Sequence, residues 1–301
     1  MTNAAEDRLS LQTPARAGAK PAKYRLGLAL VTLSAIAWST AGYFTRLIPL
    51  DAWTLLAWRG LFGALGIAIA VVVLEPRGSR LAMGGPGWLF AIVSAVAMTL
   101  FITSLKETTV AHVAVIYATV PFVAAGLGWL ILRERPSVGA IVASATALVG
   151  VVLMVGLSAE GGWLGDAIAL AMTLCVATMM VIARRFRDIP GLRAAALSTL
   201  LSALFCWPLG HPLQVSGHDL LLLAIFGLAN SALGIGLFAL GARYLPVVET
   251  ALIGSLDAPL APLWVWLAFN ETPGGGTILG GLIVFAAVGA YLIGAKRRRI
   301  V

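Results

Sequence analysis

Apolar runs of about twenty residues alternate with short polar, Gly-rich or Pro-containing segments from residue 26 to residue 295. An α-helix needs about 20 apolar residues to cross the hydrocarbon core of a membrane. The pattern therefore predicts an all-α polytopic membrane protein with ten transmembrane helices, each boundary good to about three residues. The expected spans are 26–45, 52–74, 87–105, 110–132, 137–156, 163–183, 193–209, 219–241, 247–268 and 276–295.

The chain contains an internal sequence repeat. Residues 110–139 and residues 247–276 are identical at nine of thirty positions when they are aligned with a shift of 137 residues. The shared positions include a Trp-Leu pair and the pattern Glu-x-Pro-x-x-Gly, which chance similarity between apolar helices does not easily supply. Because the duplicated unit has five spans, an odd number, the second copy starts on the opposite side of the membrane and is inverted relative to the first. We therefore expect two inverted five-helix repeats, residues 26–156 and 157–295.

The positive charges indicate the orientation. With the N-terminus inside, 18 of the 21 Lys and Arg residues fall in cytoplasmic segments, and Arg46 and Lys106 alone fall in outer loops. The positive-inside rule then predicts that both termini are cytoplasmic. Residues 1–25 are expected to form a disordered cytoplasmic tail and residues 296–301 a basic one.

Composition excludes a soluble protein, because 60% of the residues are apolar and 11% are charged, against about 25% charged in soluble domains. The net charge of +8 follows the topology, so we expect no nucleic-acid partner. Cys175 and Cys206 lie in apolar runs and are expected to be buried thiols. Serine triads, phosphate loops and Cys/His metal spacings are missing from the sequence, so we expect no enzyme, no cofactor and no metal.

The spans and their duplication resemble the EamA-type branch of the drug/metabolite transporter superfamily, over about residues 26–295. The matching residues are Trp38-Ser39, Arg59, Pro121 with Glu134 and Gly139, and Pro259 with Glu271 and Gly276. The resemblance implies a central cavity built from helices 1, 3, 4, 6, 8 and 9, with helices 5 and 10 at the periphery. Within that branch the chain resembles a bacterial exporter of aromatic amino acids, which implies an inner-membrane location and a small-molecule substrate.

Two charged residues lie inside predicted spans, where an ionised group costs about 2.5–3.5 kcal/mol. Asp257 falls near the middle of the ninth span; it either binds a substrate amine or a coupling proton, or is a structural carboxylate. Arg59, in the second span, either pairs with Asp257, extends outward to the surface, or meets a substrate carboxylate. We assign both residues to coupling or gating. Pro121, Pro259 and Pro262 are expected to break or bend their helices.

Polar and aromatic side chains inside other spans are candidates for substrate binding. Asn230 and Ser231 lie midway along the eighth span, where they either bind a zwitterion or hold helices together. The remaining candidates, which alternatively serve only in packing, are Trp38, Ser39, Tyr43, Phe101 and Tyr117.

These features favour a secondary transporter that exports neutral or aromatic amino acids by alternating access. Protons are a candidate coupling ion. Multidrug efflux and metabolite uptake are alternatives within transport, and a membrane-embedded enzyme acting on a lipid-linked substrate is the alternative class. Small residues spaced four apart in the fifth and tenth spans allow close helix packing in lipid. We interpret them as contacts within one chain, so a monomer is favoured, with a dimer as the alternative.

Overall fold

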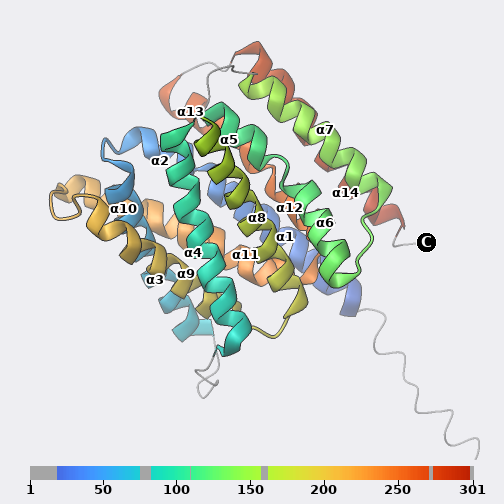
Figure 1. The fold of residues 1–301 in the computed structure, drawn as a ribbon, viewed down its shortest axis with the longest axis horizontal. Coiled ribbons are helices and arrows are strands. Elements are labelled where there is room, and N and C mark those ends of the chain that lie inside the picture. The colour runs from blue at the N-terminus through green and yellow to red at the C-terminus, as the bar shows by residue number, and fades with distance from the viewer. Residues whose placement is uncertain (1–18, 75–82, 109, 157–161, 271–273, 299–301) are drawn as a thin grey trace, which may run out of the picture.

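The computed structural model describes residues 19–74, 83–108, 110–156, 162–270 and 274–298, and all regular structure within these ranges is helical (Figure 1). In chain order the helices are α1 (Ala19–Ser39), α2 (Ala41–Leu47), α3 (Ala52–Leu74), α4 (Gly84–Glu107), α5 (Val110–Tyr117), α6 (Val120–Leu132), α7 (Val138–Val155), α8 (Trp163–Arg185), α9 (Gly191–Cys206), η1 (Trp207–Leu209), α10 (Gly217–Phe226), η2 (Gly227–Ile235), α11 (Gly236–Gly241), η3 (Ala242–Tyr244), α12 (Val247–Gly254), α13 (Asp257–Phe269) and α14 (Gly275–Arg298).

These helices form ten segments long and apolar enough to cross a membrane, which confirms the predicted number of spans. The first segment differs from its prediction. Helix α1 begins at Ala19, so residues 19–25, which were assigned to the tail, are helical. Tyr24 explains the extension, because its ring is buried in a cluster with Leu245 and Ile253. Burial of this apolar surface stabilises the additional helical turn. Residues 1–18 lie outside the described part of the chain.

The fourth and ninth spans are each made of two shorter helices. The break falls at residues 118–119 between α5 and α6, and at residues 255–256 between α12 and α13. Hydroxyl groups accompany both breaks: Thr119 donates to the Ile116 carbonyl at 2.6 Å, and Ser255 donates to the Leu252 carbonyl at 2.7 Å. Pro121 lies in the first turn of α6, where its missing N–H costs no helical hydrogen bond.

The duplication is visible in the backbone. Helices α12 and α13 begin and end 137 residues after α5 and α6, without a shift at any of the four bounds. Helices α7 and α14 also begin 137 residues apart. The two five-helix units are therefore repeats of one structure. Because each unit has an odd number of spans, the second unit is inverted in the membrane relative to the first.

Each repeat packs its first helix against the other repeat. Helix α1 contacts α11, α12 and α13, whereas α8 contacts α4, α5 and α6. Two glycines allow the same close approach. A Cβ at Gly27 would lie 2.9 Å from Tyr244 Cβ, and one at Gly165 would lie 2.6 Å from Thr108 Cβ. A Cβ at Gly27 would also lie 3.1 Å from Leu245, and residues 245 and 108 correspond under the shift of 137, so both crossings meet the same position before a split helix.

Helices α7 and α14 lie side by side at one edge of the bundle, away from its centre (Figure 1). Ala143 and Ala147 of α7 are buried against Val284 and Ala287 of α14. The small residues of the fifth and tenth spans thus contact one another within the chain.

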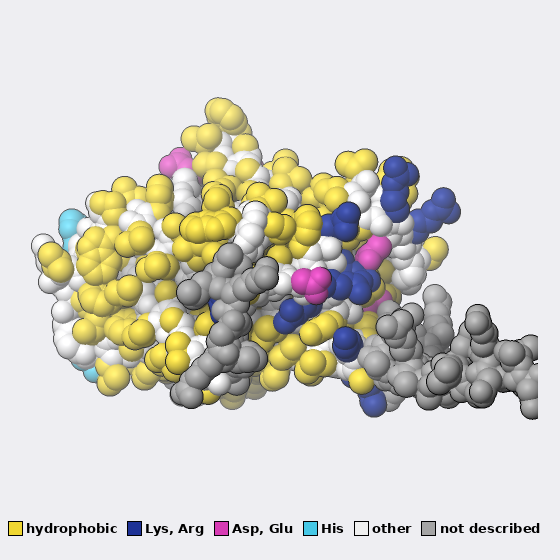
Figure 2. Space-filling view, turned by 90° about the horizontal axis from the view of Figure 1, so that it is seen from below, with side chains coloured by type: hydrophobic (Ala, Val, Ile, Leu, Met, Phe, Trp, Pro, Cys, Tyr) yellow, Lys and Arg dark blue, Asp and Glu magenta, His cyan; other side chains and the backbone are white. Residues whose placement is uncertain are grey.

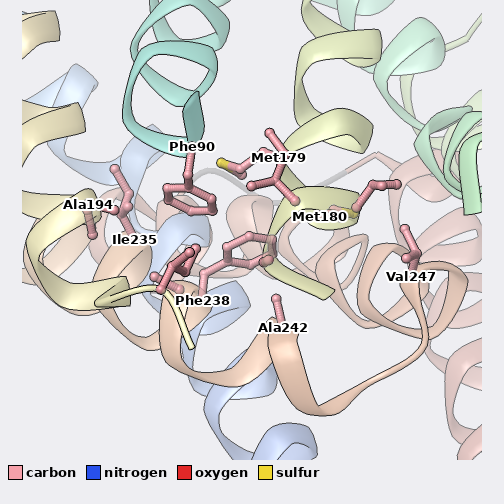
Figure 3. Close-up of a cluster of buried hydrophobic side chains, with 14 of the residues drawn as sticks. Phe90, Met179, Met180, Ala194, Ile235, Phe238, Ala242 and Val247 are labelled. Carbon is pink, nitrogen blue, oxygen red and sulfur yellow. The ribbon is translucent and has the colours of Figure 1, made fainter. Parts of the chain in front are cut away.

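The largest buried cluster lies between the halves. Phe90, Met179, Ile235 and Phe238 come together there from α4, α8, η2 and α11 (Figure 3). Outside, hydrophobic side chains cover most of the face shown in Figure 2, and Lys and Arg side chains gather toward one end. An apolar surface with charges at its ends is the distribution expected of a membrane protein.

Candidate functional site

The Arg59 cluster consists of Arg59 on α3 and the side chains that its guanidinium contacts, which come from two other spans: Met98, Phe226 and Asn230. One guanidinium nitrogen, Nη1, donates to Asn230 Oδ1 at 3.3 Å, and Nη2 lies 3.3 Å from the sulfur of Met98. The guanidinium carbon is 5.3 Å from the centre of the Phe226 ring, a cation–π distance. Nε is buried without a hydrogen-bond partner, and no carboxylate among the described residues lies within 4.0 Å.

Asn230 and Ser231 belong to η2, a π-helical stretch in the middle of the eighth span. The Asn230 amide donates to the carbonyls of Ala37 and Trp38 at 3.2 and 3.1 Å, so α1 and α3 are connected through this side chain. Ser231 is buried where α3 carries Gly63, and a side chain at residue 63 would collide with it. π-Helical turns are frequent at functional sites because the wider turn displaces side chains from the regular helical positions.

Trp38 brings a second unsatisfied donor to the same interface. Its ring packs on Gly234 of η2, and its centre is 5.2 Å from that of Phe238. The indole Nε1 is buried and has no acceptor. A buried polar group without a partner is costly, so two such groups on neighbouring helices indicate a site that is completed by another molecule or another conformation.

Asp257 is the first residue of α13, directly after the break in the ninth span. A helix N-terminus is a favourable place for a carboxylate because the free N–H groups and the helix dipole stabilise negative charge. The carboxylate is hydrogen-bonded to the backbone at Ala258, and Tyr117 of α5 lies within electrostatic reach of it. Asp257 and Tyr117 thus lie within electrostatic reach of each other, next to the interruptions of the two split helices.

The other candidates lie at different depths. Ser39 is buried and accepts a hydrogen bond of 2.7 Å from the indole N–H of Trp264, which joins α1 to α13. Tyr43 lies in another cluster, with its ring 5.0 Å from that of Phe44. Phe101 is 40% exposed on the surface of α4, away from the Arg59 cluster.

Of the two prolines in the ninth span, Pro259 is buried in the first turn of α13, and Pro262 lies inside that helix without ending it. Of the two repeated glutamates, Glu134 pairs with Arg184 Nε at 2.8 Å, while Glu271 lies outside the described residues.

Sequence reasoning missed two polar contacts between the halves. Nδ1 of His112 on α5 is 3.0 Å from Asp166 Oδ1 on α8, and Thr108 donates to the same oxygen at 2.8 Å. Glu249 of α12 accepts a hydrogen bond of 2.8 Å from Tyr24 of α1 and one of 2.9 Å from Tyr291 of α14. The signal was present in the duplication, because the shift of 137 aligns His112 with Glu249.

Ten apolar helices in two inverted repeats, with a polar cluster at the contact between the repeats, define a multi-pass membrane protein of the duplicated transporter type. The model of the EamA-like transporter family matches the chain twice, at residues 25–156 and 163–293. The chain therefore belongs to the EamA-like transporter family, whose members are transporters of small molecules across membranes.

A comparison with solved structures bears on the fold. A crystal structure titled only "Crystal structure of protein" superposes with a TM-score of 0.77, covering 90% of this chain and 98% of the other at 17% sequence identity. At that identity the likeness concerns the fold alone. No curated protein matches the sequence.

Proposed function

We propose that this transporter exports small organic metabolites, with neutral and aromatic amino acids as the leading substrates, by alternating access through a central cavity. The observation that carries the proposal is the state of Arg59, a cation inside the membrane without a described carboxylate partner and with an unsatisfied Nε. A substrate carboxylate would accept hydrogen bonds from this guanidinium and remove the cost of the unpaired charge.

The other end of a zwitterion has a candidate partner too. Asp257 is a carboxylate at a helix break, within electrostatic reach of Tyr117, and it is suited to hold an ammonium group or a transferred proton. Trp38, Tyr117 and Met98 all pack against the central apolar cluster, which supports a preference for substrates with a flat apolar side chain.

We infer that both termini face the cytoplasm of a bacterium and that the protein resides in the inner membrane as a monomer. The asymmetry of the Lys and Arg residues between the two sets of loops supports this orientation. The contact between α7 and α14 within one chain supports the monomer, because it covers Ala143 and Ala147 of α7 and Ala287 of α14.

The test is transport by the purified protein in liposomes loaded with a panel of labelled amino acids, with and without an imposed pH gradient. We expect efflux of neutral or aromatic amino acids, and no efflux from liposomes without protein. Acceleration by the gradient would indicate proton coupling, whereas equal rates would indicate facilitated diffusion.

A second panel of lipophilic cations and of metabolites without an amino group decides between the alternatives. Transport of those compounds, with amino acids excluded, would contradict the substrate assignment and favour a multidrug or other metabolite transporter. Separate assays in liposomes of known orientation compare efflux with uptake.

A further inference from the structure

Two polar contacts join the halves at positions that the duplication makes equivalent. His112 begins the fourth span and bonds to Asp166 near the start of α8. Glu249 occupies the matching position in the ninth span and bonds to Tyr24 near the start of α1. Each contact therefore connects the split helix of one repeat to the first helix of the other repeat.

The two contacts lie at opposite faces of the membrane. His112 and Glu249 are each the third residue of the first helix in a split span, α5 and α12, and those spans are five apart in the chain. Helices five spans apart run in opposite directions, so their starts lie on different sides. The glycine crossings at Gly165 and Gly27 support this arrangement, since each brings the start of a first helix against the junction that precedes a split helix.

We propose that the His112–Asp166 pair and the Glu249–Tyr24 pair are gate contacts on the two membrane faces, and that each transport cycle breaks them in turn. The inference rests on alternating access, which is part of the proposed function. Inverted repeats that exchange conformations expose the centre first to one side and then to the other. A contact between the halves at one face must open when that face opens.

The chemistry of each contact suits a switch. Glu249 is 6% exposed, so its carboxylate depends on partners, and Tyr24 and Tyr291 approach it from two different helices. A cavity of about 120 Å³ lined by Glu249 and Tyr291 adjoins this contact. At the other face, Asp166 is held by His112 and by Thr108, so both ends of the α4–α5 junction contact α8.

The test measures access to the centre and needs no knowledge of the substrate. Cys175 and Cys206 are replaced by alanine, and a single cysteine is introduced as Tyr117→Cys. Its rate of modification by a membrane-impermeant thiol reagent is measured in right-side-out and inside-out vesicles. The rate ratio between the two faces reports the balance between the two open states.

We expect Asp166→Asn to increase the relative rate from the face that holds residue 112, by about fivefold, and Glu249→Gln to increase it from the opposite face by a similar factor. This is the change in equilibrium constant that follows from losing the net stabilisation of one ordinary hydrogen bond. Asp219→Asn and Asp188→Asn are the controls, because they remove an equal charge at residues for which no hydrogen bond or ion pair between the halves is found in the described part of the chain.

Milder variants guard against misfolding. Thr108→Val and Tyr24→Phe each delete one hydroxyl donor and are expected to shift the ratio in the same two directions, by less. An unchanged ratio in folded variants, or a shift toward the same face in both, would overturn the proposal. Failure of the amino-acid assay would leave this result intact, because thiol modification is measured without substrate.

Discussion

Arg133 and Asn270 are the only residues other than glycine with positive φ in the described part of the chain, at 58° and 54°, and they lie 137 positions apart. Arg133 ends α6 and Asn270 ends α13, each as a left-handed C-cap. Their side chains share no chemistry, yet the backbone at both positions is the same. The duplication has thus preserved a left-handed helix end after the residue identities diverged.

A left-handed conformation is costly for arginine because its Cβ approaches the following carbonyl group, and glycine avoids that cost. We expect Arg133→Gly to stabilise the protein by about 0.5–1 kcal/mol, measured by thermal unfolding in detergent. Arg135→Gly removes the same charge two residues later, in a position without positive φ, and is expected to give no gain. An unfolding temperature of Arg133→Gly that is no higher than that of Arg135→Gly would contradict this prediction.

The sequence was sufficient to predict the number and placement of the spans, because the cost of burying backbone in lipid leaves few alternatives to apolar helices. The shift of 137 likewise predicted the inverted repeats. The sequence predicted interruptions at Pro121 and Pro259, but it did not place the breaks at residues 118–119 and 255–256, and it did not predict the π-helical stretch η2. Those features depend on how helices from different repeats pack, as where Ser231 meets Gly63.

The candidate site was predicted only in part. Hydropathy singled out Arg59 and Asn230 because each is polar inside an apolar span, and the structure brings the two together. Pairing with Asp257 was one of three alternatives for Arg59, beside extension to the surface and contact with a substrate carboxylate, and the guanidinium contacts Asn230, Met98 and Phe226 instead of Asp257. Pairing across the bundle depends on helix rotation, which periodicity within one helix does not specify.

Arg59→Lys tests the carboxylate assignment. Lysine keeps the charge but not the planar fork that engages a carboxylate at two points. We expect KM for transported amino acids to rise about tenfold, equivalent to about 1.4 kcal/mol, with a smaller change in maximal rate. The decarboxylated amines of the same substrates serve as control competitors, and their inhibition constants should stay unchanged. An equal loss for both classes of compound would make Arg59 a structural residue.

Asp257→Asn tests proton coupling. The amide keeps the size of the side chain and removes the site at which a proton could bind, so transport by the variant should no longer respond to an imposed pH gradient. Exchange of labelled for unlabelled substrate, which needs no net proton movement, should continue. A variant that responds to the gradient as the unmodified protein does would leave Asp257 with a structural role at the start of α13.

Asp51 precedes α3 and stabilises its first turn. Partial burial tends to raise the pKa of this carboxyl group, but hydrogen bonds from the Thr54 hydroxyl and from the N–H groups of Thr54 and Trp53 outweigh it and lower the pKa below 3.8. A depressed pKa in the folded state means that the stabilisation is complete above the unfolded value of 3.8 and is lost as pH falls through the folded value.

Asp51→Ala should therefore lower thermal stability by about 1 kcal/mol near neutral pH, as loss of an N-terminal cap does. The difference from the unmodified protein should disappear in acid. Asp219→Ala provides a comparison at the start of α10, where Ser216 also caps the helix. A difference for Asp51→Ala that persists at low pH would show that the carboxylate charge is not the cause.

The contact between α7 and α14 depends on glycine at two facing positions. A Cβ at Gly150 would lie 2.7 Å from the Gly280 carbonyl oxygen, and a side chain at residue 280 would meet the Gly150 carbonyl in return. Gly280→Leu should force the helices apart and expose the packing of Ala147 and Val284, with a loss of about 2 kcal/mol or more in thermal stability.

Gly289→Leu is the matched control, because it adds the same side chain to the same helix where no atom lies within 4 Å of the new Cβ. We expect this variant to unfold at the temperature of the unmodified protein. Equal destabilisation by both leucines would mean that residue 289 is also covered. Since the described chain leaves the space around a Cβ at residue 289 open, that outcome would point to a second copy of the protein on the outer face of α14 and would favour the dimer.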